Sequence, residues 1–134
     1  MKLKIWAAQT DSGLKLMEKL GLIPTFYVKG RPNNAQCNAF YASEEWKELK
    51  SDVKRERHRL YGKLRCDKCK ADSKSKRIVA DHVKSVKLHW NMRLRKSNLQ
   101  ILCDDCNIAK GSYVDKDYRN HFSLKWRRAF GCLW

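Results

Sequence analysis

The feature that most constrains the fold of this chain is a pair of Cys-x-x-Cys motifs, Cys66/Cys69 and Cys103/Cys106. Each motif presents two thiolates from one tight turn, so the two motifs together can form a tetrahedral sulfur shell around one zinc ion. Zinc binding would close residues 70–102 into a loop. The spacing therefore predicts two short knuckles joined by a structural zinc ion.

The rest of the cysteine pattern favours reduced thiols. Six cysteines could form three disulfides, but the start MKLKIWAAQT lacks the apolar run of a secretory signal. In a reducing compartment, paired Cys-x-x-Cys motifs bind zinc more often than they form disulfides. Cys37 and Cys132 have no second cysteine at metal-binding spacing, and we expect ordinary thiols there. We also expect a cytoplasmic location.

The charge balance indicates a polyanionic partner. Among 134 residues, 30 Lys and Arg stand against 14 Asp and Glu, a formal net charge of +16. No segment approaches the roughly 20 apolar residues that a membrane-spanning helix needs. Nucleic acid therefore fits the charge better than a membrane does. A generically basic protein, such as a ribosome-associated factor, is the alternative.

The segment from Ser43 to Tyr61 is the best helix candidate. Ser43 is a suitable N-cap, Glu44 and Glu45 suit the first turn, and Gly62 can end the helix. One face carries the apolar residues Trp46, Leu49, Val53 and Leu60. The opposite face carries Lys47, Lys50, Lys54, Arg55 and Arg59. That basic face is either solvated or follows a phosphate backbone, and the sequence leaves both interpretations open.

Between the two cysteine pairs, the pattern predicts a strand, a loop and a second strand. The β-branched residues in 77–83 favour a strand that ends at Asp81 and His82, the only Asp-His dipeptide in the chain. Residues 84–96 carry five cations and no acid, which predicts a loop. Residues 99–102 predict the second strand, and we expect Asn107 to begin a helix.

This succession would bring Asp81, His82 and Asn107 together around a second, oxygen-preferring ion. Here the sequence resembles the HNH endonucleases, the ββα-metal nucleases, in their zinc-stapled subset. Asp81-His82 matches the first His position, Asn98 matches the Asn, and Asn107 stands where the last His is usual. The resemblance is specific over residues 66–111 and weaker over 40–49.

The resemblance implies a small α+β fold with a ββα-metal core at about residues 66–112, stapled by the four cysteines and flanked by N-terminal and C-terminal helices. Residues 1–35 would be an N-terminal extension, and residues 36–134 would be the nuclease domain. The tail from Tyr118 mixes cations with aromatic residues and predicts a helix that packs its aromatic side chains against the body.

The resemblance also implies a mechanism. His82 would be the general base, and Asn98 would orient the loop that carries it. Asp81 and Asn107 would bind Mg²⁺ or Mn²⁺, because carboxylate and amide oxygens suit hard cations. The enzyme would be a DNA endonuclease that nicks one strand per active site. The expected nucleic-acid contacts are Arg77, Lys84, Lys87, Arg93, Arg95, Lys96 and Lys110.

Other interpretations stay open at the level of sequence. A non-catalytic zinc module that binds nucleic acid would need the cysteines and the cations but not His82. A junction resolvase would cut branched DNA as an obligatory homodimer. RNA is an alternative partner, because phosphate contacts do not separate it from DNA. The resemblance further suggests a bacterial or phage-infected cell and an association with phage packaging or replication.

Overall fold

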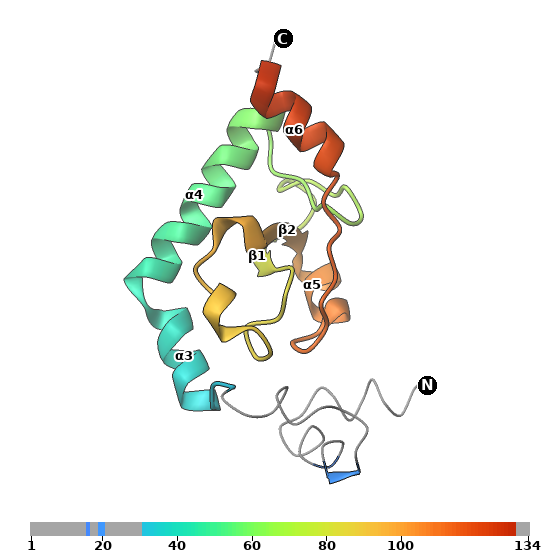
Figure 1. Cartoon of the computed structure of the whole chain (residues 1–134). Helices are drawn as coiled ribbons and strands as arrows, with labels where there is room; N and C mark the ends of the chain where they lie inside the picture. Colours follow the sequence, from blue (N-terminus) through green and yellow to red (C-terminus); the bar gives the residue numbers. More distant parts are fainter. Residues whose placement is uncertain (1–15, 17–18, 21–30, 131–134) are drawn as a thin grey trace.

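Helix α4, Glu44–Tyr61, forms one side of the molecule, as the sequence predicts (Figure 1). The structure is a computed structural model that describes residues 16, 19–20 and 31–130. The Ser43 hydroxyl accepts a hydrogen bond from the Trp46 N–H, and Gly62 ends the helix with a φ of 72°. This φ is left-handed, a conformation that glycine adopts without steric cost. Most of the expected N-terminal extension and the last four residues lie outside the described part.

A second helix, α3, precedes α4 and packs against it. It spans Asn34–Ala42 and begins with a capping box. The Asn33 side chain accepts from the Gln36 N–H, and the Gln36 side chain accepts from the Asn33 N–H. These reciprocal bonds satisfy two backbone donors at the helix start. Cys37 and Phe40 are buried on its inner face, so α3 belongs to the core.

Two antiparallel strands form the centre of the fold. Strand β1, Ile78–His82, pairs with β2, Leu99–Cys103, in a register that places Ile78 opposite Cys103 and His82 opposite Leu99. Both strands lie where the sequence predicts them. The connection contains two short 3-10 helices, η2 (Trp90–Met92) and η3 (Lys96–Asn98), within the predicted loop.

Helix α5, Asp104–Lys110, follows β2 directly and begins three residues before the predicted start at Asn107. Cys103 is its N-cap residue, and Asp104 and Asp105 occupy its first turn. The two carboxylates stabilise that turn through the helix dipole. The prediction did not take these acidic residues into account. Asn107 is consequently one turn inside the helix.

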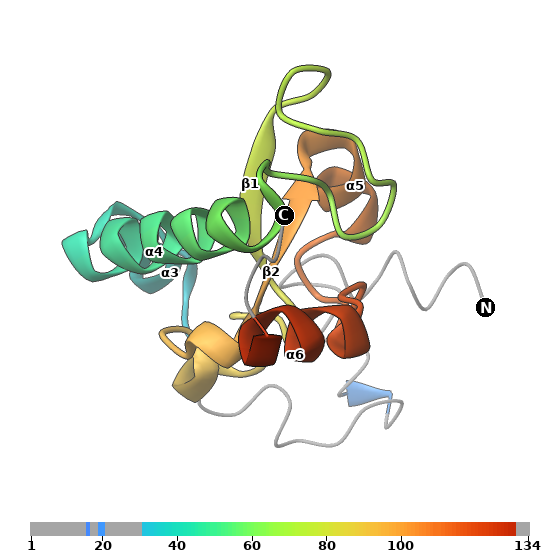
Figure 2. The ribbon, with the colours of Figure 1, turned by 90° about the horizontal axis from the view of Figure 1, so that it is seen from above.

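Helices α4 and α5 lie on opposite sides of the β1–β2 pair (Figure 2). The core between them consists mainly of Phe40, Trp46, Val53, Ile78, Val86, Leu99, Ile101 and Leu102. The last helix, α6, spans His121–Phe130 and packs near the C-terminal end of α4. The aromatic side chains that were expected to anchor it, Phe122, Trp126, Phe130 and Trp134, lie outside the described side chains. The helices and the two-stranded sheet together form the small α+β fold that was predicted.

A buried ion pair ties α4 to the first knuckle. The Arg57 guanidinium donates to both carboxylate oxygens of Asp67, at 2.7 and 3.0 Å, and both side chains are less than a tenth exposed. Asp67 also accepts from the Ile101 N–H at 2.8 Å. Lys54, expected on the outer face of the helix, instead donates to the Ile78 carbonyl at 2.8 Å. Two cations of α4 are therefore structural.

In the described part of the chain, no helix combines the length and the apolar character that a membrane crossing requires.

Candidate active site and metal centre

The four cysteines of the two knuckles form one cluster. Their Sγ atoms all lie within 4.8 Å of one another, and those of Cys69 and Cys103 are 3.7 Å apart. Four sulfurs at about 2.3 Å from a tetrahedral zinc ion would be separated by about 3.8 Å. The donor set and the spacing thus fit a zinc ion held by Cys66, Cys69, Cys103 and Cys106.

Each knuckle is formed by local backbone hydrogen bonds. In the first, the Lys70 N–H donates to the Cys66 carbonyl and Lys70 has a left-handed φ of 66°. The Asp67 N–H donates to the Ile101 carbonyl at 2.7 Å, which fixes this knuckle to β2. The second knuckle is the junction of β2 and α5, because Cys103 caps the helix and Cys106 lies in its first turn.

Burial and hydrogen bonding set the acidities of these thiols. Burial raises the pKa of Cys66, but N–H groups of Cys69, Cys103 and Lys68 outweigh it and bring the pKa to about 7. Burial and hydrogen bonds to the other three thiols raise the pKa of Cys106 to about 12. Four thiolates this close repel one another, and a divalent cation would remove that repulsion.

Asp81 lies near the end of β1 with its carboxylate held by two donors. Its Oδ2 accepts from Gln100 Nε2 at 2.9 Å and lies 3.1 Å from Lys110 Nζ. The Lys110 ammonium also donates to the His82 carbonyl at 2.7 Å. Gln100 is fully buried and donates to the Lys116 carbonyl as well. The carboxylate is therefore oriented by Gln100 of β2 and Lys110 of α5.

His82 is the next residue, and its imidazole is buried. Its Nε2 lies 2.8 Å from the Arg93 carbonyl, which only accepts hydrogen bonds, so Nε2 carries the proton and Nδ1 keeps the lone pair. The ring stacks on Trp46 at a centroid distance of 4.8 Å and an angle of 20°. Burial lowers the pKa of His82, with Lys110 acting in the same direction against Arg93 and Asp81. The imidazole is accordingly neutral at pH 7.

Asn98 connects the two ends of the loop that follows His82. It is buried, and its Oδ1 accepts from the Lys84 N–H at 2.8 Å. Its Nδ2 donates to the carbonyls of Lys84 and Met92, at 3.1 and 3.3 Å. Its own carbonyl accepts from the Val83 N–H at 2.8 Å. These bonds tie Asn98 to the start of the loop and to Met92, the residue directly before Arg93, whose carbonyl contacts His82.

Asp81, His82 and Asn107 line one cavity of about 460 Å³. Tyr41 and Trp46 from the helices before the knuckles form another part of its wall. Carboxylate and amide oxygens in one cavity fit a hard divalent cation, and a neutral imidazole beside them fits a base. The donor set of this cavity is thus compatible with Mg²⁺ or Mn²⁺.

The cations expected to contact nucleic acid fall into two groups. Arg77, Lys84, Arg95 and Lys96 are exposed, and Lys87 and Arg93 are half-buried. The Arg93 guanidinium lies 4.3 Å from the Trp90 ring centroid. Lys110 differs from the expectation, because its side chain is only 2% exposed and is bound to Asp81 and the His82 carbonyl. It belongs to the cavity wall and not to the outer surface.

Two contributors to this site were not predicted from the sequence. The sequence predicted Gln100 only as part of a strand. Its position between the apolar residues Leu99 and Ile101 was the available signal, because a polar side chain buried in a strand requires a hydrogen-bond partner. Trp46 was predicted as a core residue, and its contact with His82 depends on how α4 packs across β1.

Two comparisons with known proteins give a match. Residues 66–113 match the family model described as HNH endonuclease. Among solved structures, one of the HNH endonuclease of the deep-sea thermophilic bacteriophage GVE2 with manganese ion is 28% identical. The match covers 73% of this chain and 89% of that chain, with a TM-score of 0.46. No curated protein gives a match. The two knuckles, the β1–β2 pair and α5 all lie inside the residues that match the HNH endonuclease family model.

Proposed function

We propose that this protein is a divalent-metal-dependent DNA endonuclease that hydrolyses one phosphodiester bond per active site. The observation that carries the proposal is the cavity shared by Asp81, His82 and Asn107, inside the segment that matches the HNH family. The basic composition supports a nucleic-acid substrate, since a polyanion is attracted by a net charge of +16.

His82 would act as the general base. Its Nδ1 holds the lone pair, because Nε2 donates to the Arg93 carbonyl. A water molecule at Nδ1 would lose a proton to the imidazole as its oxygen attacks phosphorus and the bond from phosphorus to the leaving 3′ oxygen breaks. General-base catalysis of this kind contributes about 10²–10⁴ in rate. The stacked Trp46 and the Arg93 carbonyl would hold the ring in the orientation that this transfer needs.

Asp81 and Asn107 would hold Mg²⁺ or Mn²⁺. When bound, such an ion supplies charge stabilisation to the phosphate oxygens as the bond breaks. Gln100 and Lys110 would keep the Asp81 carboxylate in place. The zinc ion held by the four cysteines would have a separate, structural role, because a closed sulfur shell leaves no position for substrate.

Asn98 would act on the position of His82 and not on the substrate. It binds the backbone of Lys84, at the start of the loop, and of Met92, the residue directly before Arg93, whose carbonyl orients His82. The exposed cations Arg77, Lys84, Arg95 and Lys96 would bind phosphates without reading bases. Lys87 and Arg93, half-buried, would contribute to the same surface. A phage or bacterial cytoplasm would be the setting.

The test is incubation of supercoiled plasmid with zinc-loaded protein. With Mg²⁺ we expect open circles from the wild type and none from His82→Ala or after Mg²⁺ is omitted. Linear product would indicate paired active sites, as in a homodimer. Equal plasmid binding by both proteins with cleavage by neither would reject the hydrolase and favour a zinc-dependent binding module.

A further inference from the structure

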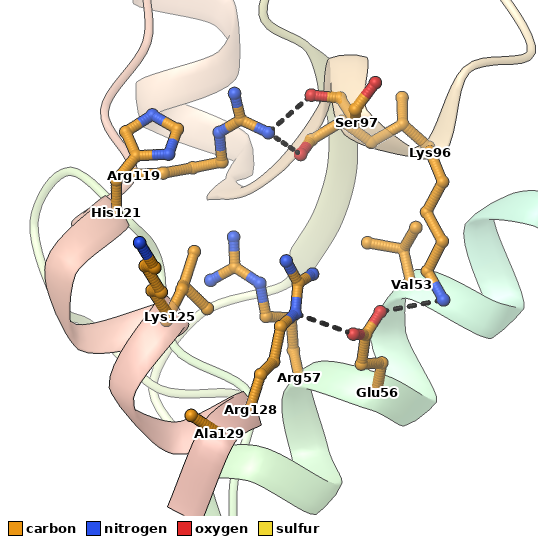
Figure 3. Close-up of a pocket in the computed structure, with 12 residues that line it drawn as sticks. Val53, Glu56, Arg57, Lys96, Ser97, Arg119, His121, Lys125, Arg128 and Ala129 are labelled. Atoms are coloured by element: carbon orange, nitrogen blue, oxygen red, sulfur yellow. Dashed lines mark hydrogen bonds and ion pairs between the residues drawn. The ribbon is translucent and has the colours of Figure 1, made fainter.

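A second cavity lies at the other end of α4, between this helix, α6 and the start of β2 (Figure 3). Its volume is about 780 Å³, and none of its lining residues lines the cavity of His82. Its inner surface includes Val53, Leu99 and Leu124, all buried. The charged residues around them come from three separate segments of the chain. This cavity was not predicted from the sequence.

Cations outnumber acids in the cavity wall. One lining residue, Glu56, is an acid. Five lining residues are cations: Arg57, Lys96, Arg119, Lys125 and Arg128. Asp67 and Asp117, which lie outside the wall, pair with two of these cations. Five cations and three acids then give a net charge of 5 − 3 = +2 around the cavity. His121 also lines the cavity and would add charge when protonated. The excess of positive charge is therefore concentrated around this cavity, in addition to the positive net charge of the whole chain.

The cations of the cavity differ in how far acids neutralise them. Glu56 lies 2.7 Å from Lys96 and 3.0 Å from Arg128, so one carboxylate serves two cations. Lys125 is exposed and, among the described residues, makes no ion pair. In Figure 3 the Arg128 side chain extends from α6 towards Glu56 on α4, and the Lys125 side chain extends from α6 towards His121, which also lines the cavity. A negatively charged group there would be within reach of cations from two helices.

One of the other arginines is fixed in place and shapes the wall. Arg119 donates to the carbonyl groups of Ser97 and Leu99, at 2.6 and 3.2 Å, and to Asp117. These bonds hold the segment before α6 against the start of β2, so this wall of the cavity is fixed by hydrogen bonds. A preformed basic cavity of this kind suits a phosphate group better than a random cluster of surface lysines does.

The separation of this cavity from the candidate active site can be compared with the spacing of phosphates along DNA. Trp46, which stacks on His82, and Glu56 are ten residues apart on α4. At 1.5 Å per residue, their separation along the helix is about 15 Å. A DNA strand carries one phosphate per 3.4 Å of axis, so this span corresponds to about four nucleotides.

We propose that the α4–α6 cavity binds a backbone phosphate of the DNA substrate, about four nucleotides from the phosphate that is cut. The proposal rests on the proposed function for the identity of the substrate. Lys125 and Arg128 are the principal ligands, with Lys96 shared between the phosphate and Glu56. Helix α6 lies outside the residues that match the HNH family, so this contact is an addition to the family's core.

The test measures binding without cleavage. Zinc-loaded protein is titrated into a labelled 20-bp duplex without added Mg²⁺, at several salt concentrations, for the wild type and for Lys125→Gln/Arg128→Gln. The matched control, Lys47→Gln/Lys74→Gln, removes the same charge from exposed residues outside both cavities. We expect the cavity variant to raise Kd about tenfold and to lower the slope of log K against log salt by about 1. The control should change Kd less than about threefold by long-range attraction alone.

A second variant tests the same cavity in the opposite direction. Glu56→Gln removes the carboxylate that competes with a phosphate for Lys96 and Arg128, and we expect Kd to fall about twofold to threefold. Equal Kd values and slopes for the cavity variant and the control would overturn the proposal, as would weaker binding by Glu56→Gln at unchanged Tm. If the wild type fails to cut plasmid while the cavity variant still loses affinity, the nuclease proposal fails and the phosphate contact stands.

Discussion

At the scale of single residues, the position of His82 is set by groups that are far from it in the sequence. Trp46 lies on one face of the ring, and the Arg93 carbonyl accepts from its Nε2. A base must be held in one rotamer and one tautomer to take a proton from a fixed water position. His82 satisfies both conditions only because α4 and the loop after β1 converge on it.

Replacement of Trp46 should reduce activity more than its effect on stability explains. We expect Trp46→Leu to lower the cleavage rate at least tenfold, because the imidazole loses the surface on which it stacks, and Trp46→Phe to restore much of the rate. Leu60→Ala on the same helix is the control, since it also leaves a cavity in the core and Leu60 lines neither candidate site. Parallel losses of rate in Trp46→Leu and Leu60→Ala at equal Tm would remove the positioning role.

Asn98 makes a different prediction, because it contacts backbone alone. Asn98→Ala leaves the Lys84 N–H without its acceptor in a buried site, which should cost about 1–3 kcal/mol of unfolding free energy. We expect its cleavage rate to fall less than that of His82→Ala, measured with both proteins folded. A rate as low as that of His82→Ala, at full folding, would instead indicate direct participation in the reaction.

At the scale of elements, the sequence predicts best where local signals agree. Helix α4 begins and ends as predicted, because Ser43 and Gly62 are strong local caps. The predicted start of α5 was wrong by three residues, because the prediction began the helix at Asn107 and neglected the acidic first turn at Asp104 and Asp105. The Cys-x-x-Cys spacing predicted the sulfur cluster, since tetrahedral zinc geometry needs little information beyond the four ligands.

Zinc removal should unfold the domain, since the two knuckles join β2 and α5 to the chain before β1. Structural zinc sites contribute about 10 kcal/mol or more to folding in small domains. We expect one zinc ion per chain by atomic absorption, and loss of the cooperative thermal transition after chelation or in Cys66→Ser. Cys37→Ser should keep its zinc, because Cys37 lies in the core between α3 and its neighbours. A folded, zinc-free Cys66→Ser protein would contradict this account.

Buried cations were beyond prediction from the pattern, because a charged residue on a helix is usually solvated. Arg57 shows why: its partner Asp67 lies in the first knuckle, ten residues later and outside the helix. Arg57→Ala should cost about 3–5 kcal/mol, because it leaves the Asp67 carboxylate buried and unpaired. Arg55→Ala, which breaks the exposed pair with Asp52, should cost less than 1 kcal/mol. Chemical denaturation of both variants measures the difference.

At the scale of the whole molecule, the net charge predicts a polyanionic partner but says nothing of the arrangement of the cations. Some predicted contacts are exposed, Lys110 is buried beside Asp81, and a further basic cavity forms between α4 and α6. The last two depend on packing between elements distant in the chain, which periodicity and composition do not encode. Residues of α4 line both cavities, so this helix would set the distance between the proposed cleavage site and the proposed phosphate-binding site.

The central claim is that the cavity of Asp81, His82 and Asn107 performs hydrolysis and does not merely bind nucleic acid. The most direct test is the single-turnover cleavage rate of one labelled duplex with Mg²⁺, measured for wild type and His82→Ala together with Kd for the same duplex. We predict a rate constant lower by about 10²–10⁴ in His82→Ala, with Kd unchanged within about twofold. Equal rate constants for the two proteins, or a loss explained entirely by Kd, would contradict the account.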